Sequence, residues 1–296
     1  MTRLLVPLLR LAVDAGRAIR SVSASGDFQT ERKDDDSPLT LADRASHDII
    51  DSGLRALIPG VPVLSEEGPP VSWDERAGWD ELWVVDPLDG TKSFIRQNGE
   101  YTVNIALVRD GAPVLGVIYA PVLEVAWTGI VRRNGVGLTA AGRATGDARR
   151  LGSRELSRVC AGASSPEAGS PGEPIAVRPR DDRHITIIAS RTHLNAATTA
   201  YIERVAAGFE TVEIANVGSS LKLCRIAEGS ADLYPRFAPT SEWDTAAGHA
   251  IIRAAGGDVY QAGSDHVNAI LEAGSRVPLQ YNKPDLLNPS FIACAW

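Results

Sequence analysis

The stretch that decides the fold is Trp83-Val84-Val85-Asp86-Pro87-Leu88-Asp89-Gly90-Thr91-Lys92-Ser93-Phe94. The apolar residues 82–85 predict a short strand that ends at two carboxylates, Asp86 and Asp89. Pro87 restricts Asp86 to an extended conformation, and Gly90 permits a backbone geometry that other residues resist. The pattern therefore predicts a strand that turns sharply into a helix.

Such a corner can hold a metal ion and a phosphate group together. Thr91 is placed to cap the predicted helix. The free amides at the start of a helix attract anions, while two neighbouring carboxylates attract hard cations such as Mg²⁺. The alternative interpretation of these residues alone is a surface Asp-Pro-x-Asp-Gly turn that joins two structural elements.

Length and composition indicate a globular chain that acts on a small ligand. The chain has 296 residues, of which 44% are hydrophobic and 23% are charged, which suffices for a large core or two packed lobes. A net charge of −7 argues against nucleic-acid binding by a general basic surface. A locally basic pocket for a small phosphorylated ligand is compatible with this charge.

The cysteines and the amino-terminal residues bear on location. Cys160, Cys224 and Cys294 lie far apart without CxxC pairing, so neither a zinc site nor a disulfide framework is indicated. A reducing cytoplasm is the predicted location. Residues 1–20 are rich in leucine, but charged residues interrupt them, so we predict an amphipathic helix rather than a targeting segment or a membrane span. Weak peripheral membrane association and the oligomeric state stay open.

Two further acids precede the corner. Asp43 lies near the start of a helix predicted over residues 44–57, where it either caps the helix or projects into a cleft and orients a water. Glu66 follows a short strand predicted over residues 61–64. Adjacent glutamates at a strand end are usually surface charge. If the two strands are neighbours in one sheet, however, Glu66 and Asp86 reach a common edge.

The rest of the chain divides into two halves. Alternating apolar residues predict antiparallel strands over 101–107, 113–119 and 122–130, with Arg109-Asp110-Gly111 as a hairpin turn, and then loops with one weak strand over 131–156. Residues 161–182 lack apolar periodicity and predict an exposed, flexible connector. Strands over 185–189, 211–215 and 231–234 then alternate with helices over 195–207 and 219–227. We predict an amino-terminal lobe (1–160) and a carboxyl-terminal α/β lobe (183–296) that together form one catalytic unit.

A last motif surrounds Asp244, in Glu242-Trp243-Asp244-Thr245-Ala246-Ala247-Gly248-His249-Ala250. The small residues predict a closely packed helix that Gly256 ends, and Asp244 by itself is a good helix N-cap. His193 and His249 lack metal-type spacing, so each is interpreted as structural or as a hydrogen-bond donor to a ligand. The chain has no GxxxxGK[ST] loop, which argues against a common class of NTP hydrolase.

Three motifs together resemble one family. Ser65-Glu66-Glu67, the Asp86 to Thr91 run and the Trp243 to Gly248 run resemble, in order and spacing, the inositol monophosphatase superfamily of Mg²⁺-dependent, lithium-sensitive phosphatases. Further likeness at residues 33–43, 98–106, 218–222 and 233–237 is to its CysQ-type 3′(2′),5′-bisphosphate nucleotidases. The resemblance implies an α/β fold, a two-lobed sandwich of alternating helix and sheet layers. The chain departs from the family in a long 161–182 segment and at Gly68, where relatives carry an acid.

The resemblance implies a site with two or three Mg²⁺ ions. Glu66, Asp86 and the backbone carbonyl of Leu88 would hold one ion, and Asp86, Asp89 and Asp244 a second. Thr91, with Glu66 and Asp43, would orient a water for in-line attack on phosphorus. The amides of Gly90 and Thr91 would receive phosphate oxygens.

Substrate specificity is expected from the second half of the chain. The resemblance implies that His193, Ser219, Lys222 and Arg236 contact a nucleotide, with Lys222 and Arg236 offsetting the phosphate that is not cleaved. The expected reaction converts adenosine 3′,5′-bisphosphate to AMP and phosphate, in sulfate assimilation, and the sulfated analogue stays open as a second substrate. The alternatives are an inositol or sugar monophosphatase with the same metals and a non-catalytic protein that binds nucleotide or metal.

Overall fold

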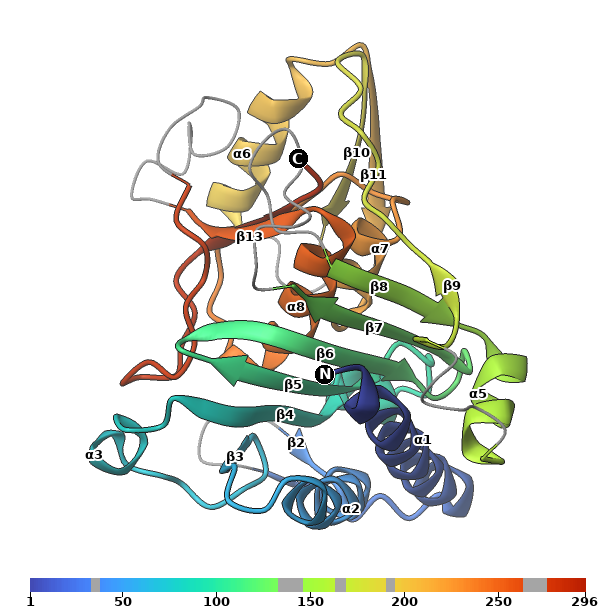
Figure 1. Cartoon of the computed structure of the whole chain (residues 1–296). Coiled ribbons are helices and arrows are strands. Elements are labelled where there is room, and N and C mark those ends of the chain that lie inside the picture. Colours follow the sequence, from blue (N-terminus) through green and yellow to red (C-terminus); the bar gives the residue numbers. More distant parts are fainter. Residues whose placement is uncertain (33–37, 133–145, 163–168, 190–194, 263–275) are drawn as a thin grey trace.

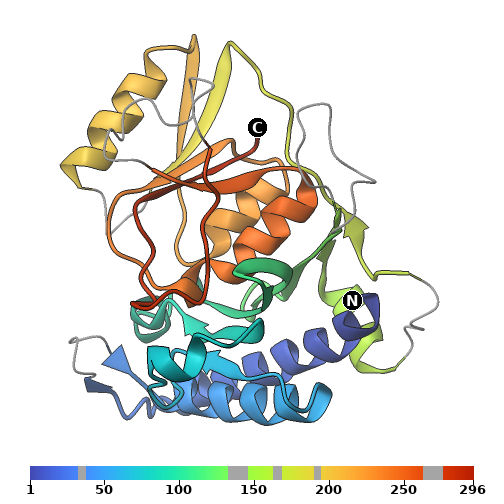
Figure 2. The ribbon, with the colours of Figure 1, turned by 60° about the vertical axis from the view of Figure 1, so that its left-hand side comes forward.

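The computed structural model describes residues 1–32, 38–132, 146–162, 169–189, 195–262 and 276–296, and these form stacked layers of helices and sheets (Figure 1). The helices α1 (Thr2–Ser25) and α2 (Leu41–Leu57) cover one face of a large sheet. The helices α7 (Leu221–Ala227) and α8 (Ala246–Ala255) lie between this sheet and a smaller one (Figure 2). The layered α/β architecture predicted from the sequence is confirmed.

The large sheet has seven strands and is mainly antiparallel. In spatial order they are β3 (Val63–Ser65), β4 (Glu81–Asp89), β5 (Thr102–Arg109), β6 (Ala112–Ala120), β7 (Val125–Val131), β8 (Gly146–Leu151) and β9 (Glu173–Pro174). Among the described strands of this sheet, only β3 and β4 pair in parallel. The predicted hairpin joins β5 to β6 through Asp110 and Gly111, whose φ values of 48° and 71° suit a turn that matches the twist of the strands.

The small sheet has five strands and comes from the second half of the chain. Its strands are β10 (His184–Ala189), β11 (Thr211–Asn216), β12 (Leu233–Arg236), β13 (Asp258–Gln261) and β14 (Phe291–Cys294), in the order β11-β10-β12-β14-β13. Strand β10 pairs in parallel with both β11 and β12, whereas β14 pairs antiparallel with both β12 and β13. Helix α6 (Ala196–Ala206) packs against β12.

Helix α1 shows how the sequence pattern produces the outer layer. Leu5, Leu8, Leu9 and Ala12 recur at helical spacing and are fully buried against the large sheet. The helix ends at Gly26, whose φ of 73° is the left-handed conformation that ends many helices. The amphipathic helix predicted over residues 1–20 is therefore confirmed, and it continues to Ser25.

Glycines on the large sheet let α8 approach it closely. A Cβ atom on Gly116 would lie 2.3 Å from the carbonyl oxygen of Ala247, and one on Gly129 would lie 2.5 Å from the Cα of Ile251. Any side chain at these two positions would push the helix away. The close approach brings the start of α8, and with it Asp244, to the strands of the large sheet.

Two segments differ from the sequence prediction in the first half. The strand predicted from residue 122 begins at Val125, because residues 121–124 form a turn in which Glu124 has a φ of 51°. Where only loops and a weak strand were predicted, the described residues form β8 and the helix α5 (Ser153–Cys160). The weak strand is present as β8, in which only Ala148 and Leu151 are buried, whereas the sequence did not predict α5.

The predicted connector 161–182 is partly a structural element. Residues 163–168 lie outside the described residues, but β9 joins the edge of the large sheet, and Ile175 and Val177 pack against the core. Arg178 forms an ion pair with the buried Asp232. Glu173, Pro174 and Ala176 are exposed as predicted, but the strand pairing, the core contacts and the ion pair make residues 173–178 part of the fold rather than a flexible connector. The division into lobes at 160 and 183 stays a prediction.

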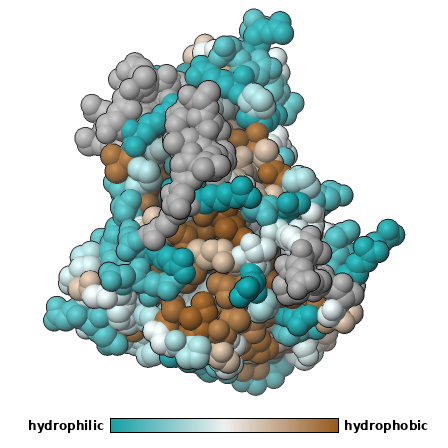
Figure 3. Space-filling view, in the orientation of Figure 1, coloured by the Kyte–Doolittle hydropathy of each residue, from teal (hydrophilic) through white to brown (hydrophobic). Residues whose placement is uncertain are grey.

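The surface in the orientation of Figure 1 is mixed in character. Apolar side chains are exposed in the middle of this face, over the large sheet, and hydrophilic ones surround them (Figure 3). Among the described residues, no helix is both long and apolar enough to cross a lipid bilayer. Peripheral membrane association and a cytoplasmic location stay predictions.

Candidate active site

The predicted turn from strand to helix is present, but it follows Asp89 rather than residue 85, so the predicted end of the strand is wrong. Strand β4 continues through the two carboxylates to Asp89, and α4 (Thr91–Ile95) begins directly after Gly90. Gly90 is the N-cap with a φ of 96°, so Thr91 is the first helical residue and not the cap that we predicted. The amide of Leu88 donates to Asp86 Oδ1 at 3.0 Å, which folds the turn back on itself.

Three carboxylates converge at this corner. Ligand oxygens of Asp86, Asp89 and Asp244 all lie within 4.8 Å of one another. Asp86 and Asp89 come from β4, whereas Asp244 belongs to the short 3₁₀ helix η2 (Glu242–Asp244) that precedes α8. A strand end and a helix start, more than 150 residues apart in the printed sequence, therefore form one acidic cluster.

Electrostatics within the cluster favour a bound cation. Burial raises the pKa of Asp86 well above its usual value of 3.8, and the neighbouring acids Glu66, Asp89 and Asp244 raise it further. Burial and then Asp89 raise the pKa of Asp244 to about 7. Carboxylates held this way repel one another, and a hard divalent ion with oxygen ligands relieves that repulsion. The donor set therefore fits Mg²⁺.

Glu66 lies beside the cluster, as the sheet prediction required. Strands β3 and β4 are parallel neighbours with Ser65 opposite Val85, and the Glu66 amide donates to the Val85 carbonyl at 3.1 Å. The side chain contributes to the raised pKa of Asp86. The hypothesis that Glu66 and Asp86 reach a common sheet edge is confirmed, although Glu66 is outside the tight group of three.

Asp43 faces the same corner. Its Oδ1 accepts a hydrogen bond from the Thr91 hydroxyl at 3.2 Å, and its Oδ2 accepts from the Thr40 amide and hydroxyl at 2.7 and 2.6 Å. Thr40, rather than Asp43, is the N-cap of α2, with Asp43 completing a reciprocal capping box. Asp43 therefore supports the cap of α2 and also bonds the threonine of the corner, while the predicted role of orienting a water stays a prediction.

Asp244 also helps to fix its own turn. Its Oδ2 accepts from the Ser241 amide at 2.8 Å, so Ser241 occupies the cap position and Asp244 stands three residues later. The N-cap of α8 is Thr245. The interpretation of Asp244 as a simple N-cap is wrong, because its carboxylate bonds back to the turn while it faces the other two acids.

Two serines from the second half hold Asp89. Its Oδ2 accepts from the Ser219 hydroxyl at 2.7 Å and from the Ser220 amide at 2.5 Å. Ser219 has a φ of 54°, so the helix predicted from residue 219 begins only at Leu221. Thr102 Oγ1 lies 2.7 Å from both serine hydroxyls. Thr102 of the large sheet and the two serines before α7 therefore jointly fix the position of the Asp89 carboxylate.

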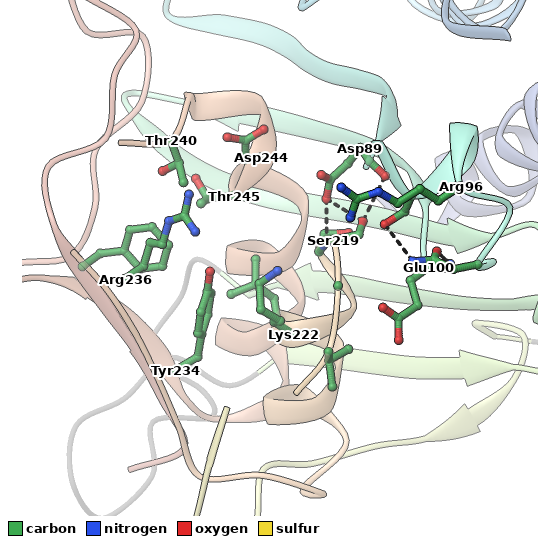
Figure 4. A pocket seen from close by; sticks show the side chains of 17 residues that line it. Asp89, Arg96, Glu100, Ser219, Lys222, Tyr234, Arg236, Thr240, Asp244 and Thr245 are labelled. Atoms are coloured by element: carbon green, nitrogen blue, oxygen red, sulfur yellow. Dashed lines mark hydrogen bonds between the residues drawn. The ribbon is translucent and has the colours of Figure 1, made fainter. Parts of the chain in front are cut away.

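A cavity of about 350 Å³ opens beside the acids. Asp89 and Asp244 border it, and so do the two cations that the sequence predicted to contact a nucleotide, Lys222 and Arg236. Figure 4 shows the acids on one side of the opening and these cations on another. His193 lies outside the described residues, so its predicted contact cannot be placed.

The cations are held by different means. The Lys222 ammonium lies 5.5 Å from the centre of the Tyr234 ring, and burial lowers the pKa of this lysine to about 8. Arg236 is buried and donates to the carbonyls of Ala238 and Pro239 at 3.2 and 3.1 Å. Both positive groups therefore face a cavity rather than bulk water.

Sequence reasoning missed other residues of the cavity wall, including Arg96, Tyr234 and Thr245. Tyr234 had a usable signal, because residues i and i+2 of a strand share a face and Arg236 was already a candidate. Arg96 is the C-cap of α4, five residues after Thr91. Thr245 has no signal other than its place after Asp244.

Comparison with known proteins agrees with this geometry. A family model described as the inositol monophosphatase family matches residues 1–295. The chain is 44% identical over 258 residues to the "3'(2'),5'-bisphosphate nucleotidase CysQ" of Salmonella typhimurium, covering 87% of this chain and 90% of the relative. It is 40% identical over 284 residues to the Escherichia coli K12 protein of the same name, covering 95% and 96%.

Solved structures agree as well. A crystal structure of CysQ from Bacteroides thetaiotaomicron matches with a TM-score of 0.76 and 42% identity, covering 100% of this chain and 98% of that one. The inositol monophosphatase from Anabaena matches with a TM-score of 0.62, covering 99% and 90%, and at 21% identity this likeness concerns the fold alone. The chain belongs to the inositol monophosphatase family.

Proposed function

We propose that this chain is a Mg²⁺-dependent 3′(2′),5′-bisphosphate nucleotidase that converts adenosine 3′,5′-bisphosphate and water to AMP and phosphate. The observation that carries the proposal is the cluster of Asp86, Asp89 and Asp244 at one cavity with Lys222 and Arg236. The relatives from Salmonella and Escherichia coli, which bear the name of this activity, match along most of the chain and support it.

The acids define where the cation would bind. Asp86, Asp89 and Asp244 would hold Mg²⁺ together, and Glu66 and the Leu88 carbonyl would complete an adjoining position. Bound there, Mg²⁺ would neutralise the carboxylates and withdraw charge from the phosphoryl group in the transition state. The number of ions, two or three, belongs to this proposal.

The chain supplies its own proton acceptor. Thr91 Oγ1 donates to Asp43 Oδ1, and the other oxygen of that carboxylate is held by two donors on Thr40. An attacking water can therefore donate to Thr91 Oγ1 while the threonine proton moves toward Asp43. The water oxygen bonds to phosphorus as the bond to the 3′-oxygen breaks, and the released 3′-oxygen takes a proton from solvent.

Phosphate and nucleotide contacts follow from what borders the cavity. The amides of Gly90 and Thr91 adjoin Asp89 and would receive oxygens of the 3′-phosphate. Lys222 and Arg236 would neutralise the 5′-phosphate, which stays on the product. Ser219 borders the cavity but its hydroxyl is bonded to Asp89, so we assign it first to holding that acid. The contact of His193 stays a prediction.

The test is phosphate release from adenosine 3′,5′-bisphosphate in Mg²⁺, with the products identified by chromatography. The proposal expects AMP and phosphate in equal amounts from the wild-type protein, and essentially none from Asp89→Asn. Arg225→Met, a change of an exposed charge on α7, serves as the matched control and should retain activity. Equal hydrolysis by wild type and Asp89→Asn would indicate a contaminating phosphatase and a chain that only binds the ligand.

A further inference from the structure

Asp244 stands on a short turn and faces other carboxylates. We define the acid turn as residues 240–245, which contain η2. The turn has hydrogen bonds of its own, because the Ser241 amide donates to Asp244 Oδ2 at 2.8 Å and the Thr245 hydroxyl donates to the Glu242 carbonyl at 3.2 Å. The neighbouring carboxylates of Asp86 and Asp89 repel that of Asp244, so contacts from outside the turn help to keep this carboxylate in place.

A buried chain of polar groups reaches the acid turn from behind. Asp258 Oδ1 lies 2.7 Å from His249 Nε2, and His249 Nδ1 lies 2.9 Å from the Tyr281 hydroxyl. That hydroxyl donates to Thr245 Oγ1 at 3.2 Å. His249, Tyr281 and Thr245 are all buried, so each polar group depends on its protein partners rather than on water.

A second side chain holds the turn from the same direction. Asn288 Nδ2 donates to Thr245 Oγ1 at 3.0 Å and to the Ser241 carbonyl at 2.7 Å. The Asn288 amide donates to the Thr240 carbonyl at 2.9 Å. Asn288 and Tyr281 thus contact the turn on both sides of Asp244, and both meet at one atom, Thr245 Oγ1.

Unlike ordinary core packing, this chain of buried polar groups ends at the cavity of the active site. Thr240 and Thr245 border the cavity of the active site, and Asp244 lies between them. The chain from Asp258 through Tyr281 therefore links the edge strand β13 to the residue that would hold the cation. Groups that orient a metal-binding carboxylate raise metal affinity, because the protein does not have to order the ligand on binding.

We propose that Tyr281, oriented by His249 and Asp258, is a positioning residue that sets the affinity of the Asp244 site for divalent cations. The proposal rests on the proposed function in one respect, namely that Asp244 is a metal ligand. Tyr281 does not contact the substrate or the cation. It acts through Thr245, and its loss lets the acid turn relax away from Asp86 and Asp89.

The test measures binding of Mn²⁺ alone to the metal-free protein, followed by the electron paramagnetic resonance signal of free Mn²⁺. Tyr281→Phe removes only the hydroxyl, and Thr245→Val removes only the oxygen where the chain meets the turn. Tyr281→Phe removes one hydrogen bond to the acid turn, which predicts an affinity roughly threefold to tenfold lower. Thr245→Val also removes the bonds to Asn288 and to the Glu242 carbonyl, so its affinity should fall at least as far. Tyr201→Phe is the matched control, because the Tyr201 hydroxyl is buried without a partner among the described residues.

A second readout separates positioning from a general loss of stability. For Tyr281→Phe, raising the Mg²⁺ concentration should restore kcat, and KM for adenosine 3′,5′-bisphosphate should stay unchanged. A merely structural role would lower the melting temperature and leave the Mn²⁺ affinity of the folded protein at the wild-type value. That result in Tyr281→Phe, or in Thr245→Val should the tyrosine variant not fold, overturns the proposal.

A third variant distinguishes this failure from failure of the proposed function. Asp244→Asn should weaken Mn²⁺ binding far more than either positioning variant. Wild-type affinity in Asp244→Asn would remove this residue as a ligand and with it the metal site proposed above. Weak binding in Asp244→Asn together with wild-type binding in Tyr281→Phe would overturn only the role of Tyr281.

Discussion

We expect the Lys222 ammonium to lower the stability of the protein and to strengthen substrate binding, and the two effects can be measured separately. The side chain borders the active-site cavity, and burial lowers its pKa from 10.5 to about 8. Lys222→Met keeps the length and removes the charge. We expect a protein that unfolds less readily and turns over the bisphosphate more slowly.

The size of the stability gain follows from that pKa. A decrease from 10.5 to about 8 corresponds to roughly 3 kcal/mol against the charged form at neutral pH. The contact with the Tyr234 ring and partial exposure of the side chain offset part of this, so we expect a net gain of about 1–2 kcal/mol. The folded lysine loses its proton before the unfolded one, so the penalty is full below pH 8 and fades toward pH 10.5. The advantage of Lys222→Met should fade over the same range.

Activity should move in the opposite direction. Removal of a charged hydrogen bond to phosphate costs about 1.5–3 kcal/mol, which predicts a kcat/KM for adenosine 3′,5′-bisphosphate roughly 10- to 100-fold lower. Turnover of inositol 1-phosphate, which lacks the second phosphate, should change little. Urea unfolding of the metal-free protein and steady-state kinetics measure the two effects, with Arg225→Met as the exposed control on α7. A Lys222→Met protein that is less stable and equally active would refute the reasoning.

Three other predictions concern the corner and the acid cluster. The stability of the metal-free protein should fall as the pH rises from about 4 to 7, because the pKa of Asp244 is raised to about 7 and the folded protein keeps this proton longer than the unfolded chain does. In calorimetry, saturating Mg²⁺ should remove this pH dependence, and a metal-free stability that does not change with pH would contradict the prediction. Thr91→Val should lower kcat by about 10²- to 10⁴-fold with KM nearly unchanged, while Thr91→Ser retains most activity. Equal losses of kcat in the two variants in steady-state assays would show that the hydroxyl is not the group that matters. Gly90→Ala should lower the free energy of unfolding in urea by about 1–2 kcal/mol, because the φ of Gly90 is 96° and a Cβ there would lie 3.0 Å from the Glu100 carbonyl. Gly78→Ala, at a position with open space around it, should leave the stability unchanged, and similar stabilities of the two variants would argue against strain at the corner.

The parts of the fold that the sequence predicted depend on local pattern. The β5–β6 hairpin follows from alternating apolar residues around a turn that tolerates positive φ, and α1 follows from apolar residues at helical spacing. The turn into α4 follows from an apolar run that leads into two carboxylates and Gly90, although the strand continues to Asp89. In each case neighbouring residues carry the information, so no distant contact had to be known.

The parts that were missed depend on distant contacts. Strand β9 and the residues after it carry no apolar periodicity, and they are held by pairs such as Arg178 with Asp232. Similarly, the Arg76 guanidinium donates to Asn282 Oδ1 at 2.8 Å across 206 positions of sequence. Ion pairs and side-chain hydrogen bonds of this kind leave no periodic trace in the sequence.

The candidate site divides in the same way. Asp86 and Asp89 lie three residues apart on one strand and could be paired from the sequence, whereas Asp244 joined them only through the family resemblance. From the sequence, Asp43 itself was the candidate cap of α2, although the spacing Thr40-x-x-Asp43 is that of a capping box. The bond from Thr91 to Asp43 spans 48 positions and needs the fold. Tyr281 and Asn288 lie far from every motif, so only the structure relates them to the acids.

The measurement that tests the central claim most directly is phosphate release in Mg²⁺ from adenosine 3′,5′-bisphosphate and inositol 1-phosphate, compared side by side at equal concentrations. The account predicts a large preference for the bisphosphate, because Lys222 and Arg236 border the same cavity as the acids and would neutralise the second phosphate of this compound. A preference for inositol 1-phosphate would leave the metal site standing and contradict the assignment of the cations. Release from neither compound would contradict the account as a whole.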